Sequence, residues 1–223
     1  MRNRCLAAAF DELLADVENE CPRRPLGDVA HVVNGRASGI AASGVRVFKT
    51  KHVYPHVLRL DRPTFITEEA AARIPRDRFL SPRDVLMANI AEGTLGRVTF
   101  VAQVEPTWTV DGQVMIIRSL DERTVLGRWL YYYLWSSHGR DQILSRRTGI
   151  PFAAKRGQTH IYTSQVVQVQ IPIPHLHLQN QIVITLDAIL AQSQLVIEDL
   201  AGTLVGLDQL RYSVLRLILR GGI

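Results

Sequence analysis

Side chains that can bind phosphates and read purines gather in one stretch of the chain, residues 146–162. Glycine and proline interrupt this stretch, which predicts a long basic loop. Arg, Lys, Asn and Gln can place paired donors or acceptors on purine edges, and loops carry most binding residues. A lone residue of this kind is more simply a solvated surface charge, but the cluster favours a binding role. Its candidates for contact with DNA are Arg146, Arg147, Lys155, Arg156, Gln158, Thr159, His160 and Tyr162.

Two smaller groups carry the same chemistry. One lies at short, strand-like segments in the first quarter of the chain, and the other flanks a glycine-containing turn. A solvated surface is the alternative for each of these residues. Their members are Arg36, Lys49, Lys51 and His52 in the first group, and Asn89 and Arg97 in the second.

Residues that could perform catalysis do not form a known pattern. The sequence has no glycine-rich cofactor turn of a methyltransferase, no Asn/Asp-Pro-Pro-aromatic motif and no phosphate-gripping Gly-x-x-x-x-Gly-Lys-Ser/Thr loop. Asp84 and Glu92 could be nuclease carboxylates, but no Glu/Gln-x-Lys follows at the expected spacing. His175 and His177 have no evident third metal ligand. The sequence therefore predicts a chain that is not an enzyme and that needs no cofactor or metal.

The basic charge is confined to the middle of the chain. Residues 22–172 carry 21 Arg and Lys against 12 acids, whereas the first 21 residues and the last 51 are both slightly acidic. Such a segment favours a polyanion, because each neutralised phosphate releases counterions. A solvated arginine-rich surface is the alternative. No apolar run reaches the length of a membrane span, and no signal peptide is evident, so we expect a soluble, intracellular chain with no membrane partner.

Three segments follow from the local patterns. We expect a short N-terminal helix within residues 1–21, an α+β domain over residues 22–175 and a long helix over residues 176–223. The middle domain should hold a curved mixed or antiparallel sheet with short helices, since its strands are not separated by regular helices. Its expected strands are 45–49, 83–88, 96–101, 107–110 and 114–117, and its expected helices are 67–74 and 126–143. The aromatic run 129–135 at helical spacing is expected to pack against the sheet rather than to stack on bases.

The last segment has a heptad pattern. From residue 182, positions alternate four and three residues apart for five repeats, and nine of eleven are apolar. A helix over this span is about 54 Å long, and its narrow stripe predicts coiled-coil pairing with another helix. An ordinary amphipathic helix packed on its own domain is the alternative. The expected dimerisation residues are Ile182, Leu186, Ile189, Val196, Leu200, Leu207, Leu210, Val214 and Leu217.

Several segments, in this order and spacing, resemble the specificity (S) subunit of type I restriction-modification systems. Residues 25–29 look like the opening of its target recognition domain, and residues 83–98 are similar to its strand, glycine loop and strand signature. Residues 111–117 resemble the next strand, 171–183 the entry into the spacer helix, and 210–215 its exit. The chain departs from the pattern at Arg83, where glycine is usual, and at Asn180, where glutamate is usual.

The resemblance implies a half subunit with one target recognition domain and one spacer helix. Such a protein binds double-stranded DNA, docks methyltransferase (M) subunits, is joined by a restriction and translocation (R) subunit, and lies in the cytoplasm of a bacterium or archaeon. With one domain and one helix, it would form a homodimer that reads a bipartite palindrome, or would pair with another half. A coiled-coil interaction protein whose basic domain binds an acidic partner is the alternative function.

Overall fold

The structure is a computed structural model. It describes residues 10–15, 17, 19–91, 93–105, 107–149 and 159–220; beyond residue 196, side chains are described only at 199, 203, 207 and 209. The described residues of the expected N-terminal helix include 10–15, which are helical. The chain divides into two compact units, residues 1–180 and 181–223.

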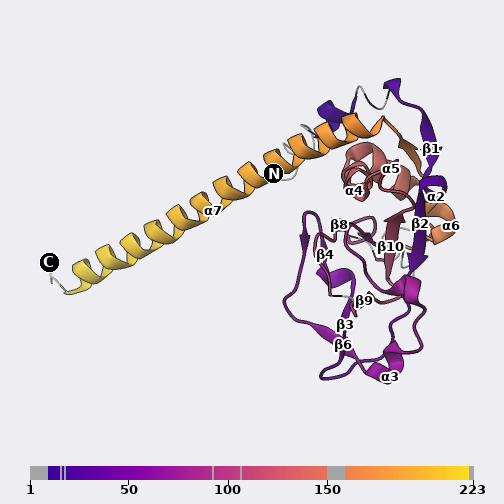
Figure 1. The fold of residues 1–223 in the computed structure, drawn as a ribbon. Helices are drawn as coiled ribbons and strands as arrows, with labels where there is room; N and C mark the ends of the chain where they lie inside the picture. Colours follow the sequence, from indigo (N-terminus) through magenta and orange to yellow (C-terminus); the bar gives the residue numbers. More distant parts are fainter. Residues whose placement is uncertain are drawn as a thin grey trace. The chain divides into compact units, whose positions relative to one another are not determined.

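A four-stranded antiparallel sheet forms the centre of the first unit (Figure 1). Its strand order is β2 (Ala30–Asn34), β10 (Val114–Ser119), β7 (Val85–Ala88) and β8 (Val98–Phe100). All four residues of β7 are buried, so both faces of the sheet are covered there. Three of the six residues of β10 are apolar and β-branched, and such residues pack well on a pleated surface.

The helix α4 (Gly127–Trp135) packs against this sheet and contacts β7, β8 and β10. Each of the six residues from Trp129 to Leu134 is fully buried. The indole Nε1 of Trp129 donates a hydrogen bond to the carbonyl of Pro172 at 3.0 Å, which satisfies the only polar atom of that buried ring. The prediction that the aromatic run belongs to the core is therefore confirmed.

A smaller mixed sheet lies beside the first. In its order β6 (Thr64–Ile66), β3 (Val45–Phe48) and β9 (Thr109–Val110), β3 is antiparallel to β6 and parallel to β9. The short α3 (Glu68–Ala71) follows β6, and the hydroxyl of Thr67 accepts a hydrogen bond from the Ala70 amide at 3.2 Å. Thr67 is therefore the N-cap of α3. Together the two sheets confirm the α+β class with mixed and antiparallel pairing.

Short elements complete this unit. A hairpin of β4 (Val53–Tyr54) and β5 (Val57–Leu58) contacts β8, and β1 pairs with β11 near the two ends of the domain. The remaining elements are β1 (Arg23–Pro25), α2 (Leu26–Val29), η1 (Thr50–His52), η2 (Arg76–Arg78), α6 (Thr163–Val166) and β11 (Gln170–Pro172).

The expected single helix over residues 126–143 is wrong, because the chain breaks at Ser136 into α4 and α5 (Ser137–Ser145). Ser136 has ψ of 164°, and its buried hydroxyl donates to the carbonyl of Tyr133 and accepts from the amide of Gly139. A Cβ on Gly139 would lie 2.1 Å from the Tyr133 carbonyl oxygen, so the sharp turn requires glycine there. Because the helix breaks here, α5, which is less apolar than α4, can follow a different direction.

The C-terminal element α7 (Leu176–Arg220) is a single helix of 45 residues, about 68 Å long. Its first turn belongs to the first unit, where Gln179 is fully buried. The Gln179 side chain accepts from the Leu126 amide at 2.9 Å and donates to the carbonyls of Thr124 and Pro174 at 2.9 and 2.8 Å. Among the residues that the structure describes, no helix is long and apolar enough to cross a membrane.

Candidate nucleic-acid interface

The ends of several strands meet at one edge of the two sheets. Because β2 and β7 are both antiparallel to β10, their last residues, Asn34 and Ala88, lie beside the start of β10. The strand β9 ends at Val110, and three residues separate it from the start of β10; β3 runs parallel to β9 and ends beside it at Phe48. The loops that follow these strands therefore form one cluster, which we call the strand-end site.

A buried amide network holds the loops of the strand-end site together. Asn89, only 6% exposed, donates through Nδ2 to the side-chain oxygen of Asn34 at 3.0 Å and to the carbonyl of Gly112 at 3.1 Å. Its backbone amide donates to the carbonyl of Gln113 at 3.1 Å. Both side-chain donors of Asn89 are thus engaged within the protein, so this predicted contact residue acts as a positioning residue.

Arg36 and Lys49 lie on adjacent loops of the site. Arg36 is exposed next to Ala37, whose amide donates to the carbonyl of Val110 at 3.2 Å. A Cβ on Gly35 would lie 2.2 Å from that same carbonyl oxygen, so glycine permits the close approach of the two loops. Lys49 is half-buried after β3. The structure brings these two predicted cations to the same edge.

Asp111 is a carboxylate of the strand-end site. Burial raises the pKa of Asp111, while a hydrogen bond from the Gln113 amide and the charge of Lys49 act in the opposite direction. The neighbouring Gln113 is exposed and offers both donors and acceptors. We did not select these residues from the sequence; the polar Asp-Gly-Gln turn between two strands was the signal that could have identified them.

The described end of the basic loop joins the strand-end site. Thr148 and His160 exchange two backbone hydrogen bonds of 2.8 and 2.9 Å, and the Ala91 amide donates to the Thr159 carbonyl at 3.1 Å. The Ile161 amide donates to the Asn89 carbonyl at 3.0 Å. The segment that follows β7 and the described ends of the basic loop therefore lie side by side, although they are far apart in sequence.

The predicted residues of the basic loop divide by exposure. Arg147 is exposed, Tyr162 is 56% exposed, and the ring of Tyr162 stacks near that of His160 with centroids 6.4 Å apart. Arg146 instead donates to the carbonyls of Gln142 and Gln168, and Thr159 is only 3% exposed. The remaining candidates, Lys155, Arg156 and Gln158, lie outside the described residues.

The other predicted residues lie at the β4–β5 hairpin. His52 is 2% exposed; its Nδ1 accepts from the Lys49 amide at 2.9 Å and its Nε2 lies 3.2 Å from the Arg62 carbonyl. Burial lowers the pKa of His52, so a neutral ring that donates from Nε2 fits both contacts. Lys51 is exposed, and Arg97 lies over the ring of Tyr54 at 5.0 Å. His52 therefore shapes the loop, whereas Lys51 and Arg97 stand at its surface.

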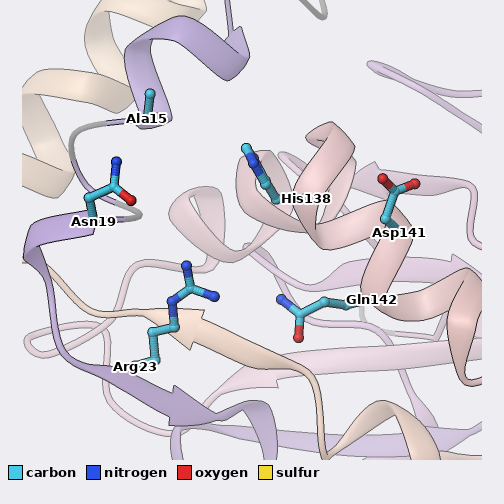
Figure 2. A pocket seen from close by; sticks show the side chains of 6 residues that line it. All are labelled: Ala15, Asn19, Arg23, His138, Asp141 and Gln142. Atoms are coloured by element: carbon cyan, nitrogen blue, oxygen red, sulfur yellow. The ribbon is translucent and has the colours of Figure 1, made fainter.

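The first unit also has a pocket that is lined by residues outside the strand-end site. Figure 2 shows its lining: Ala15 and Asn19 from the N-terminal segment, Arg23 from β1, and three residues of α5. One of these, Gln142, already donates to the Tyr133 hydroxyl and to the Gln170 carbonyl. Within the described residues, no three His, Cys, Asp or Glu side chains group together as a metal site would require.

An α+β domain of this topology followed by one long helix is the fold of one half of a type I restriction-modification S subunit. A chain of a type I restriction-modification system superposes with a TM-score of 0.62 at 21% identity, over 99% of this chain and 55% of that one. The HsdS subunit from Thermoanaerobacter tengcongensis gives 0.59 at 20% identity, over 100% and 51%. The S subunit from M. genitalium gives 0.52 at 13% identity, over 94% and 52%.

These comparisons confirm the expected resemblance at the level of the fold. This chain spans about half the length of the solved structures that it matches. No protein-family model matches the sequence, and no curated protein matches it either. The likeness is therefore one of three-dimensional structure.

Proposed function

We propose that this chain is the DNA-reading half of a type I restriction-modification specificity subunit. One observation carries the proposal: loops that hold several of the sequence-predicted contact residues, among them Arg36, Lys49 and Arg147, converge at the strand-end site of a domain with the S-subunit fold. Exposed Arg36, Arg147 and Gln113 would face the DNA there, and Tyr162 offers a ring beside them. Such side chains suit both phosphates and base edges.

The long helix provides the assembly surface in this proposal. A heptad stripe needs a partner helix, and a two-fold dimer would hold two strand-end sites at a fixed separation on a bipartite palindrome. Of the predicted dimerisation residues, Ile182 and Leu186 are buried, Ile189 is half-buried, and Val196 and Leu207 are 59% and 58% exposed. The side chains of the other four, Leu200, Leu210, Val214 and Leu217, lie outside the described part.

The chain itself would not catalyse a reaction in this role. It would bring M subunits, and later an R subunit, to the site that it reads. The alternative, an interaction protein whose basic domain binds an acidic protein, shares the helix and the charge but predicts no preference among DNA sequences.

Selection from a random duplex library tests the proposal most directly. The full chain, first measured for mass by size-exclusion chromatography with light scattering, is expected to enrich a two-part palindrome as a dimer. Arg36→Ala and Arg147→Ala should each relax the preference at particular base positions or weaken binding uniformly, depending on whether they contact bases or phosphates. A chain that binds DNA without enriching any sequence, or binds none, would contradict the proposal.

A further inference from the structure

A second cationic surface lies on the β4–β5 hairpin, outside the strand-end site. Residues 46–62 contain five Arg and Lys residues and a single acid, Asp61. Lys51, Arg59 and Arg62 are exposed. Among the described carboxylates, none lies within 4.0 Å of the charged groups of these three residues. Their charge is therefore not neutralised by ion pairs in this part of the molecule.

Tyr54 orders the guanidinium groups on this surface. Arg59 lies over the Tyr54 ring at 3.8 Å from its centroid, and Arg97, which directly precedes β8, lies over the same ring at 5.0 Å. Cation–π contacts of this kind hold a guanidinium in place while its N–H groups face outward. Part of the entropic cost of ordering these side chains on a ligand is therefore already met.

The hairpin itself is anchored in the core. At its turn, the His56 amide donates to the Tyr131 hydroxyl at 2.9 Å, and the same hydroxyl lies 2.5 Å from His56 Nδ1. The His56 ring packs edge-on to Trp135 at 4.6 Å, and burial lowers the pKa of His56 to about 4. The ring is therefore neutral near pH 7. A hairpin tied to α4 in this way presents its cations from a rigid base.

Hydrogen bonds also hold the backbone that carries the three exposed cations. Lys51 Nζ and His52 Nε2 both contact the carbonyl of Arg62, at 3.2 Å each, and the Arg59 amide donates to the His52 carbonyl at 2.9 Å. These contacts tie residues 51–52 to 59–62 across the hairpin. The three exposed cations consequently belong to one folded unit.

From this geometry we infer that the hairpin surface, formed by Lys51, Tyr54, Arg59, Arg62 and Arg97, binds the phosphate backbone of the same DNA and does not read its sequence. The inference rests on the proposed function and adds a division of labour to it. The four cations of the hairpin surface suit phosphate oxygens, and the strand-end site holds the amide side chain of Gln113, which suits base edges. A duplex extending beyond the strand-end site would meet the hairpin through its backbone.

The test removes three charges from the hairpin of the full chain. In Lys51→Gln/Arg59→Gln/Arg62→Gln, the slope of log K against log salt for a random duplex is expected to become shallower by about 2 to 3, at about 0.9 per phosphate contact. Affinity at about 0.1 M salt should fall at least about 10-fold for selected and random duplexes alike. The ratio of the two affinities should stay unchanged, because phosphate contacts carry no sequence information.

Two matched variants make this result specific. Arg24→Gln/Arg123→Gln/Arg140→Gln removes the same net charge from exposed residues on β1, the 121–124 turn and α5, and should leave the slope within about 1 of the wild type. Lys51→Arg/Arg59→Lys/Arg62→Lys keeps the hairpin charge and should restore the slope. Thermal unfolding of each variant shows whether it is folded.

The outcomes separate the inference from the proposed function. If the wild type selects a DNA sequence but the hairpin variant behaves like the charge-matched control, only the hairpin inference is overturned. If the hairpin variant loses the ratio of selected to random affinity, the hairpin reads bases and the inference is again wrong. If the wild type binds no DNA, the proposed function fails first. The exposed apolar Val57 and Leu60, at 54% and 51%, would then point to a protein partner for this surface.

Discussion

Arg83 occupies a backbone conformation that favours glycine. Its φ is 74°, in the left-handed region that side chains with a Cβ rarely adopt, and it stands directly before Asp84 at the start of β7. The S-subunit pattern usually has glycine at this position, so the departure seen in the sequence has a physical cost. Its side chain makes one long contact with Glu122 at 3.9 Å and is 66% exposed. A surface ion pair of this kind adds little stability, so it does not offset the backbone strain.

Replacement of Arg83 tests this cost. The free energy of unfolding of Arg83→Gly is expected to be about 1 kcal/mol higher than that of Arg83→Ala. Alanine keeps the backbone strain, whereas glycine releases it and loses part of the gain to the greater entropy of the unfolded chain. Both variants lose the contact with Glu122, so their difference isolates the backbone term. Urea unfolding followed by circular dichroism measures it. Equal midpoints would mean that the conformation at residue 83 is not strained.

The side chain of Asp84 holds the residues that lead into β7 in place. Its fully buried carboxylate accepts two hydrogen bonds from Arg118, at 2.7 and 2.8 Å, and one from the Ser81 amide at 2.7 Å. The same interaction raises the pKa of Arg118. Every described contact of this carboxylate therefore supports the fold at the residues that lead into β7.

At the scale of elements, one buried side chain anchors the first turn of α7. Gln179 ties the first turn of α7 to the segment 124–126 that leads into α4, through the three hydrogen bonds described above. Loss of a buried partner leaves such groups without a hydrogen bond, and each costs about 1–3 kcal/mol. The exposed neighbour Asn180 makes only a local contact with the Leu176 carbonyl.

Gln179→Leu, which nearly conserves volume, is expected to lower the free energy of unfolding by about 2–4 kcal/mol. Asn180→Ala serves as the control and should change it by less than about 0.5 kcal/mol, as exposed substitutions usually do. Chemical denaturation of the two variants in parallel provides the comparison. A loss of similar size in both would show that the effect comes from the helix and not from the buried amide.

At the scale of the whole molecule, the proposed function depends on pairing through α7. Val196 and Leu207 are large apolar side chains exposed at predicted seam positions of that helix. Large apolar residues at such positions are the usual interface of a coiled coil. Charges placed there would be buried without partners in a dimer, which is strongly unfavourable.

Val196→Glu/Leu207→Glu is therefore expected to convert the dimer to a monomer of 25.0 kDa, and to abolish selection of a two-part site while sparing binding to a half site. Gln181→Glu/Gln192→Glu adds the same two charges at exposed positions off the seam and should leave the dimer intact. Light scattering reports the mass of each. A seam variant that stays dimeric would place the interface elsewhere.

Much of the fold follows from local patterns in the sequence. Short β-rich runs bounded by turn residues predicted strands that coincide with β3, β7, β8, β9 and β10, because strand propensity is a local property of the residues. The heptad pattern predicted α7, since helix periodicity is also local. The break at Ser136 was missed, because the serine hydroxyl and the glycine that make it also occur within continuous helices. The two-residue strands of the hairpin are too short to show any periodicity.

The candidate site could be predicted only in part from the sequence. Residue type and loop composition were enough to nominate Arg36, Lys49, Arg147 and Tyr162, because the chemistry of phosphate and base contact belongs to the side chain itself. Only the tertiary structure decided that the loops after β2, β3, β7 and β9 share one edge, since strand register is fixed by pairings between distant residues. For the same reason, only the tertiary structure distinguished residues whose polar groups are engaged inside the protein, such as Asn89 and His52, from those that face outward.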